Sequence, residues 1–152
     1  MRTITSIDDA VAAAGAELGT SDWLLVDQAR IDTFADATGD HQWIHVDPQR
    51  AATESPYGTT IAHGLLTLSL IPALSKQCFV VENVRMGINY GFNKVRFIAP
   101  VKVGSRVRVR SVLTDATKVD DSTVQLTVQH TVELEGGAKP AAVAEMIGRY
   151  VF

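Results

Sequence analysis

One polar segment, residues 39–64, contains most of the residues that could carry out chemistry. Three of the chain's four histidines lie in it, namely His41, His45 and His63. Asp40 precedes His45 by five residues, and a carboxylate and an imidazole brought together on one loop can hold and activate a single water molecule. The sequence therefore suggests acid–base chemistry on water. The spacing leaves open that Asp40 only caps a turn, because Asp after Gly is common in turns.

A metal site is a second interpretation of the same segment. His41 and His45 have the i, i+4 spacing of zinc-binding helices. Gln42, however, stands where such a motif has its general-base Glu, and the stretch from Gly39 to Pro48 is too short for a stable helix. We therefore expect no metal ion.

Covalent catalysis has little support in the sequence. No G-x-S-x-G motif occurs. The one cysteine, Cys78, has only Lys76 nearby to lower its thiol pKa.

His63-Gly64 opens an apolar stretch that is expected to form a helix. The first N–H groups of a helix have no internal partner and carry the positive end of its dipole. A glycine there lets a ligand approach closely, so the Gly64 N–H could hold a developing oxyanion such as a polarised thioester carbonyl. Tight packing of the helix on a sheet explains the glycine equally well.

The stretch from Gly64 to Leu74 has apolar residues on every face, which is typical of a helix buried all round. Pro72 must kink or end this helix. After Gln77 the apolar period changes from 3.6 to 2, as in residues 123–134, where valines and leucines alternate with polar residues. Gly136-Gly137 supplies the turn into a last strand, Ala141 to Phe152. His130 lies on an apolar strand face and is expected to be a hydrogen-bonded core histidine.

Shorter elements are expected before residue 64. A helix should follow Ser6 and end near Gly15, and residues 23–26 should form a strand. A second helix should run from the cap Asp27 to a stop at Gly39, and Asp47-Pro48 should start a third. Residues 40–46 are expected to be a loop. Helices followed by strands indicate an α+β fold, in which an antiparallel sheet curls around the apolar helix.

Length, composition and net charge limit the class of protein to which the chain can belong. The 152 residues fit one domain, residues 1–152, with 46% hydrophobic and 20% charged residues. A net charge of −3 argues against nucleic acid as a partner. Asp8 and Asp9 lie where a secretory signal needs apolar residues, and the longest uncharged stretch is too polar to span a membrane. We expect a cytoplasmic protein.

Residues 39–48, GDHQWIHVDP, and residues 60–66, TIAHGLL, resemble the two-part hydratase signature of the MaoC-like family, the (R)-specific enoyl-CoA hydratases, particularly its actinobacterial members. Residues 89–97 and 100–105 extend the similarity, which covers Trp23 to Phe152. The resemblance implies a hot-dog fold, an antiparallel sheet wrapped around one long helix. Gln42-Trp43 replaces the more common Asn-Pro of the motif, which bears on loop shape and acyl-chain preference. Pro72, absent in some members, bears on the acyl tunnel.

The resemblance implies reversible hydration of a trans-2-enoyl-CoA to the (R)-3-hydroxyacyl-CoA, in fatty acid metabolism. Asp40 and His45 match the catalytic pair and Gly64 the oxyanion glycine. The sequence leaves open which of the pair is the formal base, since the two would titrate as a coupled pair. The coenzyme A thioester is the substrate, and no cofactor is required.

Further expectations concern binding and assembly. His63, Lys94 and Arg96 are proposed as substrate-binding residues, and Lys94 and Arg96 are candidates for the basic surface that the CoA phosphates need. Further basic candidates are Lys102, Arg106, Arg108 and Arg110, although charged residues also protect strand edges. Unpaired strand edges and the resemblance both favour a homodimer. A 3-hydroxyacyl-ACP dehydratase, an acyl-CoA thioesterase and a non-catalytic acyl-CoA-binding protein remain as alternatives.

Overall fold

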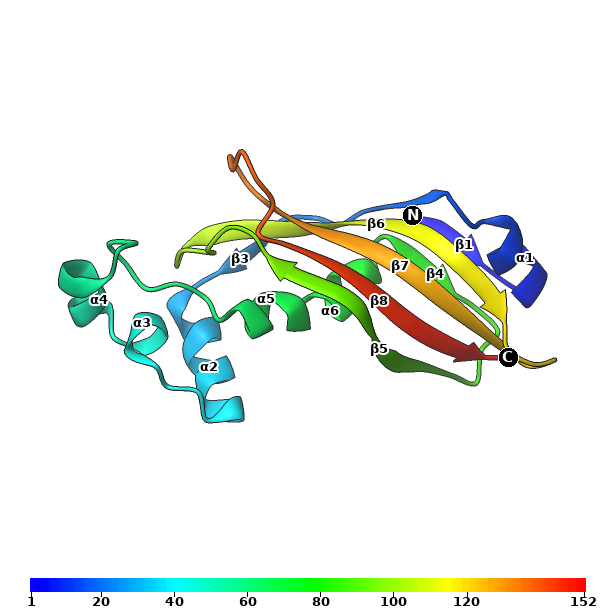
Figure 1. Ribbon diagram of the computed structural model, residues 1–152, viewed down its shortest axis with the longest axis horizontal. Helices are drawn as coiled ribbons and strands as arrows, with labels where there is room; N and C mark the ends of the chain where they lie inside the picture. Colours follow the sequence, from blue (N-terminus) through cyan, green and yellow to red (C-terminus); the bar gives the residue numbers. More distant parts are fainter.

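Four long antiparallel strands form most of a six-stranded sheet in the computed structural model, which describes all of residues 1–152 (Figure 1). They are β5 (Met86–Phe97), β6 (Ser105–Lys118), β7 (Thr123–Leu134) and β8 (Ala142–Val151). The order across the sheet is β2-β6-β7-β8-β5, and β3 also pairs with β6. The short strands β2 (Glu17–Thr20) and β3 (Leu24–Val26) therefore lie on one edge and β5 on the other.

Alternation along β7 places one set of side chains in the core, as the sequence predicts. Val124, Leu126, Val128 and Val132 are buried. His130 belongs to the same set, is 2% exposed and lies 2.9 Å from the Ser111 hydroxyl through its Nδ1. Burial lowers the pKa of His130 to about 4. This confirms that it is a neutral, hydrogen-bonded core histidine.

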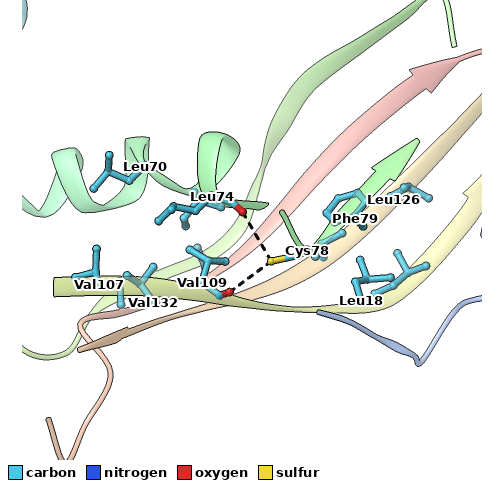
Figure 2. Close-up of a cluster of buried hydrophobic side chains, with 14 of the residues drawn as sticks. Leu18, Leu70, Leu74, Cys78, Phe79, Val107, Val109, Leu126 and Val132 are labelled. Atoms are coloured by element: carbon cyan, nitrogen blue, oxygen red, sulfur yellow. Dashed lines mark hydrogen bonds between the residues drawn. The ribbon is translucent and has the colours of Figure 1, made fainter. Parts of the chain in front are cut away.

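The apolar helix forms as two short helices in line, α5 (Gly64–Ser69) and α6 (Ile71–Ser75), joined through Leu70. Pro72 lies in the first turn of α6 and has no N–H to continue the helical bonds, so the predicted interruption is confirmed. Leu70 and Leu74 face Val107, Val109 and Val132 of the sheet (Figure 2).

The expectation that this helix is buried all round is wrong. Leu65 is 59% exposed, whereas Leu66 is 5% exposed. The sheet covers one side of the helix, and no other element of this chain covers the side that carries Leu65. Cys78 packs where the helix ends, with its Sγ 3.4 Å from the Val109 carbonyl oxygen (Figure 2). Burial raises its thiol pKa, which disfavours a reactive thiolate.

The predicted helix boundaries follow from local capping chemistry. Asp27 caps α2 (Gln28–Thr38) by accepting from the Arg30 N–H, and Gly39 ends it with a φ of 80°. Asp47 caps α4 (Pro48–Glu54). Ser6 caps α1 (Ile7–Ala12).

The sequence predicts a loop over residues 40–46, and this prediction is wrong in part. Trp43–Val46 form a single helical turn, α3. A turn this short gains little from its own hydrogen bonds. The Ile61 N–H donates to the Ile44 carbonyl at 3.1 Å, which anchors α3 to the segment before α5.

The ends of the molecule are built differently. Helices α2, α3 and α4 gather beyond one end of the sheet, and α1 and both termini lie toward the other (Figure 1). There β1 (Arg2–Ile4) pairs in parallel with β4 (Phe79–Val81), which the sequence did not suggest. No helix is both long and apolar enough to cross a membrane.

Candidate functional site

Asp40, His45 and His63 come together where α2, α3 and α5 meet. One side-chain nitrogen or oxygen from each lies within 4.8 Å of those of the other two. Asp40 follows the left-handed Gly39 that ends α2, His45 lies on α3, and His63 immediately precedes α5. The structure thus brings together Asp40 and His45, which were predicted from residues 39–48, and adds His63 from residues 60–66.

A single hydrogen bond sets the proton arrangement of His45. Its Nδ1 lies 2.7 Å from the main-chain carbonyl oxygen of Ile61. A carbonyl only accepts, so Nδ1 carries the hydrogen and Nε2 of the neutral ring keeps its lone pair. His45 is 7% exposed, and burial lowers its pKa, while the bond to Ile61 acts in the opposite direction. The ring is therefore a neutral proton acceptor near neutral pH.

His63 supports this arrangement from behind. Its ring stacks on that of His45, with centroids 3.9 Å apart and planes 24° apart, and Phe34 packs near it at 4.9 Å. The His63 Nε2–H donates to the main-chain carbonyl of Asp40 at 2.9 Å. His63 is 3% exposed and its Nδ1 has no partner. Its proposed part in substrate binding stays a prediction, whereas its contacts hold Asp40 and His45 in place.

Asp40 provides the open side of the cluster. The residue is exposed, and its carboxylate accepts one bond, from the Gln42 N–H at 3.3 Å. A carboxylate has two oxygens with about four acceptor positions. Asp40 therefore retains acceptor capacity for a water molecule beside His45.

Gly64 lies at the beginning of α5, at the wall of a cavity of about 290 Å³ that Thr67 and Phe97 also line. A Cβ at Gly64 would come within 3.0 Å of the Phe97 ring. Close packing against β5 thus accounts for the glycine. Its N–H, in the first turn of a helix, also has no helical partner, so the oxyanion role stays a prediction.

Asp40, His45 and His63 also have the residue types of a metal site, and one possible ligand atom from each lies close to those of the other two. One ring nitrogen of His45 and one of His63 is bonded to a main-chain carbonyl, as in many metal-binding histidines, so the expected absence of a metal stays a prediction. His41, the other member of the zinc-like spacing, is exposed and pairs instead with Asp36 at 2.8 Å, which raises the pKa of His41. The four-residue spacing therefore does not form a metal site with His45.

The basic residues proposed for phosphate binding fall into two groups. Lys94 and Arg96 are exposed on the edge strand β5. Arg106, Arg108 and Arg110 each pair with a glutamate. Arg108 also stacks over Trp23 at 4.5 Å. The arginine row is thus engaged within the sheet, and Lys94 and Arg96 remain the better candidates.

A second cavity, of about 460 Å³, lies at the far end of the broken helix. Pro72 and Ser75 of α6 line it on one side, and Leu126, Met146 and Tyr150 of the sheet on the other. Pro72 is eight residues from Gly64, roughly 12 Å along a helix axis. Nothing in the sequence except the position of Pro72 indicates this cavity.

Sequence reasoning missed the residues that hold the site together. Gln28, Thr60 and Ile61 make the polar contacts behind His45. Neither their residue types nor their spacing marks them. Only their proximity in the fold does.

Comparison with known proteins gives a consistent result. The family model described as MaoC like domain matches residues 9–134. The 3-hydroxyacyl-thioester dehydratase Z of Mycobacterium tuberculosis is 59% identical over 151 residues, covering 99% of each chain. Nodulation protein N of Rhizobium leguminosarum bv. viciae is 50% identical over 143 residues, covering 93% of this chain and 89% of that one.

Solved structures confirm the predicted hot-dog fold. A monoamine oxidase regulatory protein from Archaeoglobus superposes with a TM-score of 0.81 at 21% identity, covering 99% of this chain and 96% of that one. An (R)-hydratase of A. caviae gives a TM-score of 0.69 at 24% identity, covering 89% and 94%. At these identities the likeness concerns the fold alone.

The contrast between His45 and His41 gives a testable prediction. In a titration of ¹⁵N-histidine-labelled protein by NMR, His45 should titrate below the usual pKa of 6.5 as the Nδ1–H tautomer, and His41 above it. Because the folded state resists protonating His45, this residue should lower the free energy of unfolding as pH falls below 6.5. A His45 pKa at or above that of His41 would contradict the described geometry.

Proposed function

The chain belongs to the MaoC-like dehydratase family, and from this we propose that it catalyses the reversible hydration of a trans-2-enoyl-CoA to the (R)-3-hydroxyacyl-CoA. The observation that carries the proposal is the neutral His45, whose Nε2 keeps its lone pair in the cluster that also contains the Asp40 carboxylate. Two acceptors can hold one water molecule, so that one of them takes its proton while the other orients it.

The chemistry requires only the elements of water. Asp40 and His45 hold one water molecule, the pair takes a proton from it, and its oxygen forms the bond to C3 of the enoyl group. The electrons of the double bond shift toward the thioester oxygen, which the Gly64 N–H stabilises. C2 then takes up a proton from the pair, which completes the addition. No metal or redox cofactor takes part.

The cavity below α6 is proposed to hold the acyl chain. A chain whose thioester lies at Gly64 and which follows the helix reaches Pro72 after roughly 12 Å. The walls there are mainly apolar, as an alkyl chain needs. Lys94 and Arg96 are proposed to lie toward the CoA phosphates.

A homodimer is proposed as the working form. Strand β5 ends the sheet, and nearly all its residues are exposed. Met86, Ile88, Tyr90, Phe92 and Phe97 are between 41% and 56% exposed, which is a large apolar surface for an edge strand. A second copy could pair with this edge in a closed two-fold arrangement.

Dehydration of a 3-hydroxyacyl thioester is the second candidate, favoured by the name of the 59%-identical mycobacterial relative. It is the reverse of the same reaction and needs the same residues. Whether the carrier is CoA or an acyl-carrier protein is a question of the docking surface. A thioesterase would instead direct water to the thioester carbon and release a free thiol.

One assay tests for hydration and separates it from thioester hydrolysis. Purified protein is mixed with crotonyl-CoA and, separately, with longer enoyl-CoAs, and the absorbance of the enoyl-thioester band is followed with and without a chelator. We expect the band to decay without release of free thiol and regardless of the chelator. Thiol release would indicate a thioesterase, and an unchanged band with every chain length would contradict the proposal.

Neutral substitutions at the two acceptors should abolish activity. Asp40→Asn and His45→Gln are each expected to lower kcat by about 100-fold or more, because acid–base catalysis typically contributes that much. The exposed Asp36–His41 pair supplies matched controls, since Asp36→Asn and His41→Gln make the same changes nearby. A variant of the first pair that keeps more than about a tenth of wild-type kcat would remove that residue from the mechanism.

Gly64 can be tested by separating its N–H from its small size. Gly64→Pro removes the donor, and His63 already has the φ of −57° and ψ of 137° that residues before proline prefer. Gly64→Ala keeps the donor and presents the same Cβ to Phe97. We expect proline to lower kcat about 100-fold more than alanine at similar thermal stability. Equal losses in both variants would assign Gly64 to packing alone.

The homodimer has its own test. Light scattering should give about twice 16.4 kDa at micromolar concentration. Ile88→Lys on β5 should shift the protein toward the monomer, whereas Val119→Lys, in the exposed turn between β6 and β7, should not. A wild-type protein of 16.4 kDa would exclude the dimer.

A further inference from the structure

The Gln28 side chain bridges the two segments that form the site. It begins α2, directly after the cap Asp27. Its Nε2 donates to the main-chain carbonyl of His45 at 2.7 Å and to the Asp32 carboxylate at 2.8 Å. Its Oε1 accepts from the Thr60 hydroxyl at 2.6 Å. One amide therefore joins α2 to α3 and to the strand-like segment before α5.

The partners determine which end of the amide points where. A carbonyl and a carboxylate only accept, so both hydrogens of Nε2 are used. The hydroxyl of Thr60 is a donor to the opposite end. A glutamate at position 28 has the same shape but no donor at neutral pH, and it would bring an oxygen against two acceptors.

These bonds close a ring around His45. From Gln28 the ring passes through Thr60 to Ile61, whose carbonyl binds the His45 Nδ1–H, and returns through the His45 carbonyl to Gln28. Thr60 is 0% exposed. The segment Thr60–Ile61 thus holds the ring of His45, and Gln28, which is bound to the same segment, holds its main chain.

Helix α3 needs such an external contact. It has four residues, and Gln42 at its beginning makes no side-chain capping bond. So short a turn is unstable alone. The Ile61 N–H donates to the Ile44 carbonyl of this turn. Gln28 adds a side-chain donor from another helix, which binds the His45 carbonyl.

We propose that Gln28 is a positioning residue for His45: its amide fixes α3 against Thr60–Ile61, so that the His45 Nε2 stays directed at the water held with Asp40. The proposal rests on the proposed function for its kinetic consequence. In this proposal Gln28 acts through His45 and makes no contact with the substrate. A displacement of about 1 Å in a catalytic group can cost 100-fold in rate.

The kinetic test compares four variants in the crotonyl-CoA assay. Gln28→Met and Gln28→Glu should each lower kcat about 10- to 100-fold with little change in KM. Asp32→Asn keeps an acceptor for Gln28 and should stay near wild type. Gln77→Glu is the matched control, because Gln77 only accepts a bond, from the Asp22 N–H.

A double variant separates loss of the donor from charge repulsion. If Gln28→Glu failed only because two carboxylates meet, adding Asp32→Asn would restore kcat. The proposal requires that it does not, because the His45 carbonyl still lacks its donor. Restoration to near the wild-type rate would overturn it.

Thr60 gives a conservative rescue. Thr60→Val removes the hydroxyl at nearly constant shape and should lower kcat, whereas Thr60→Ser keeps the donor and should recover most of it. Equal rates in the two variants would show that the hydroxyl bond to Gln28 has no effect on the site.

The NMR signals of His45 test the proposal without any substrate. In wild-type protein and Gln77→Glu the His45 Nδ1–H should be slow to exchange. The Gln28→Met variant is measured well below its thermal unfolding midpoint, so that it is folded. In this variant the His45 Nδ1–H should exchange faster, and the pKa of His45 should move toward 6.5. Unchanged His45 signals would overturn the proposal. An inactive wild-type protein with these NMR changes would contradict the proposed function and leave the role of Gln28 supported.

Discussion

The site depends on the hydrogen bond from the His45 ring to the carbonyl of Ile61. This bond, 2.7 Å long, joins the imidazole on α3 to the main chain of the segment before α5. It fixes the tautomer and leaves Nε2 as an acceptor. Burial makes the neutral ring the stable form, and stacking on His63 holds its plane. Without that bond, nothing would determine which ring nitrogen of His45 carries the hydrogen and which can accept a proton from water.

The remaining structure keeps the two halves in contact. The sheet supports α5 and α6 on one face. The break between these two helices at Leu70–Pro72 places α6 over the apolar cavity. Helices α2, α3 and α4 gather at one end of the sheet, where Asp40 follows α2 and His45 lies on α3. The position of the acid–base pair at one end of the broken helix and of the cavity at its other end matches a substrate with a reactive head and a long apolar tail, which is what we propose.

Local chemistry explains which elements could be predicted from the sequence. Asp27 with Gly39, and Asp47 with Pro48, are capping signals that depend on neighbouring residues only, and both were found in the structure. The alternation in β7 likewise reflects a local pattern. By contrast, α3 and the parallel pairing of β1 with β4 depend on partners far away in the chain.

The site shows the same division. Asp40 and His45 could be proposed from residue types at short spacing, and the structure brings them together. Gln28 could not, because a glutamine at the start of a helix is ordinary and its partners lie 17 and 32 residues away. The apolar pattern predicts that Leu65 lies in the core, although nothing in this chain covers it. Patterns thus predict which residues are apolar or reactive, whereas tertiary contacts decide which are covered or held.

The stereochemistry of addition tests whether Asp40 and His45 act together on one water molecule. In the proposed mechanism Asp40 and His45 act from one side of the substrate, so the same face of the double bond should receive the oxygen at C3 and the proton at C2. Hydration of crotonyl-CoA in D₂O, followed by NMR and chiral analysis of the 3-hydroxybutyryl product, measures both. We expect the (R) product, with deuterium added syn to the hydroxyl. An (S) product, or anti addition, would contradict it.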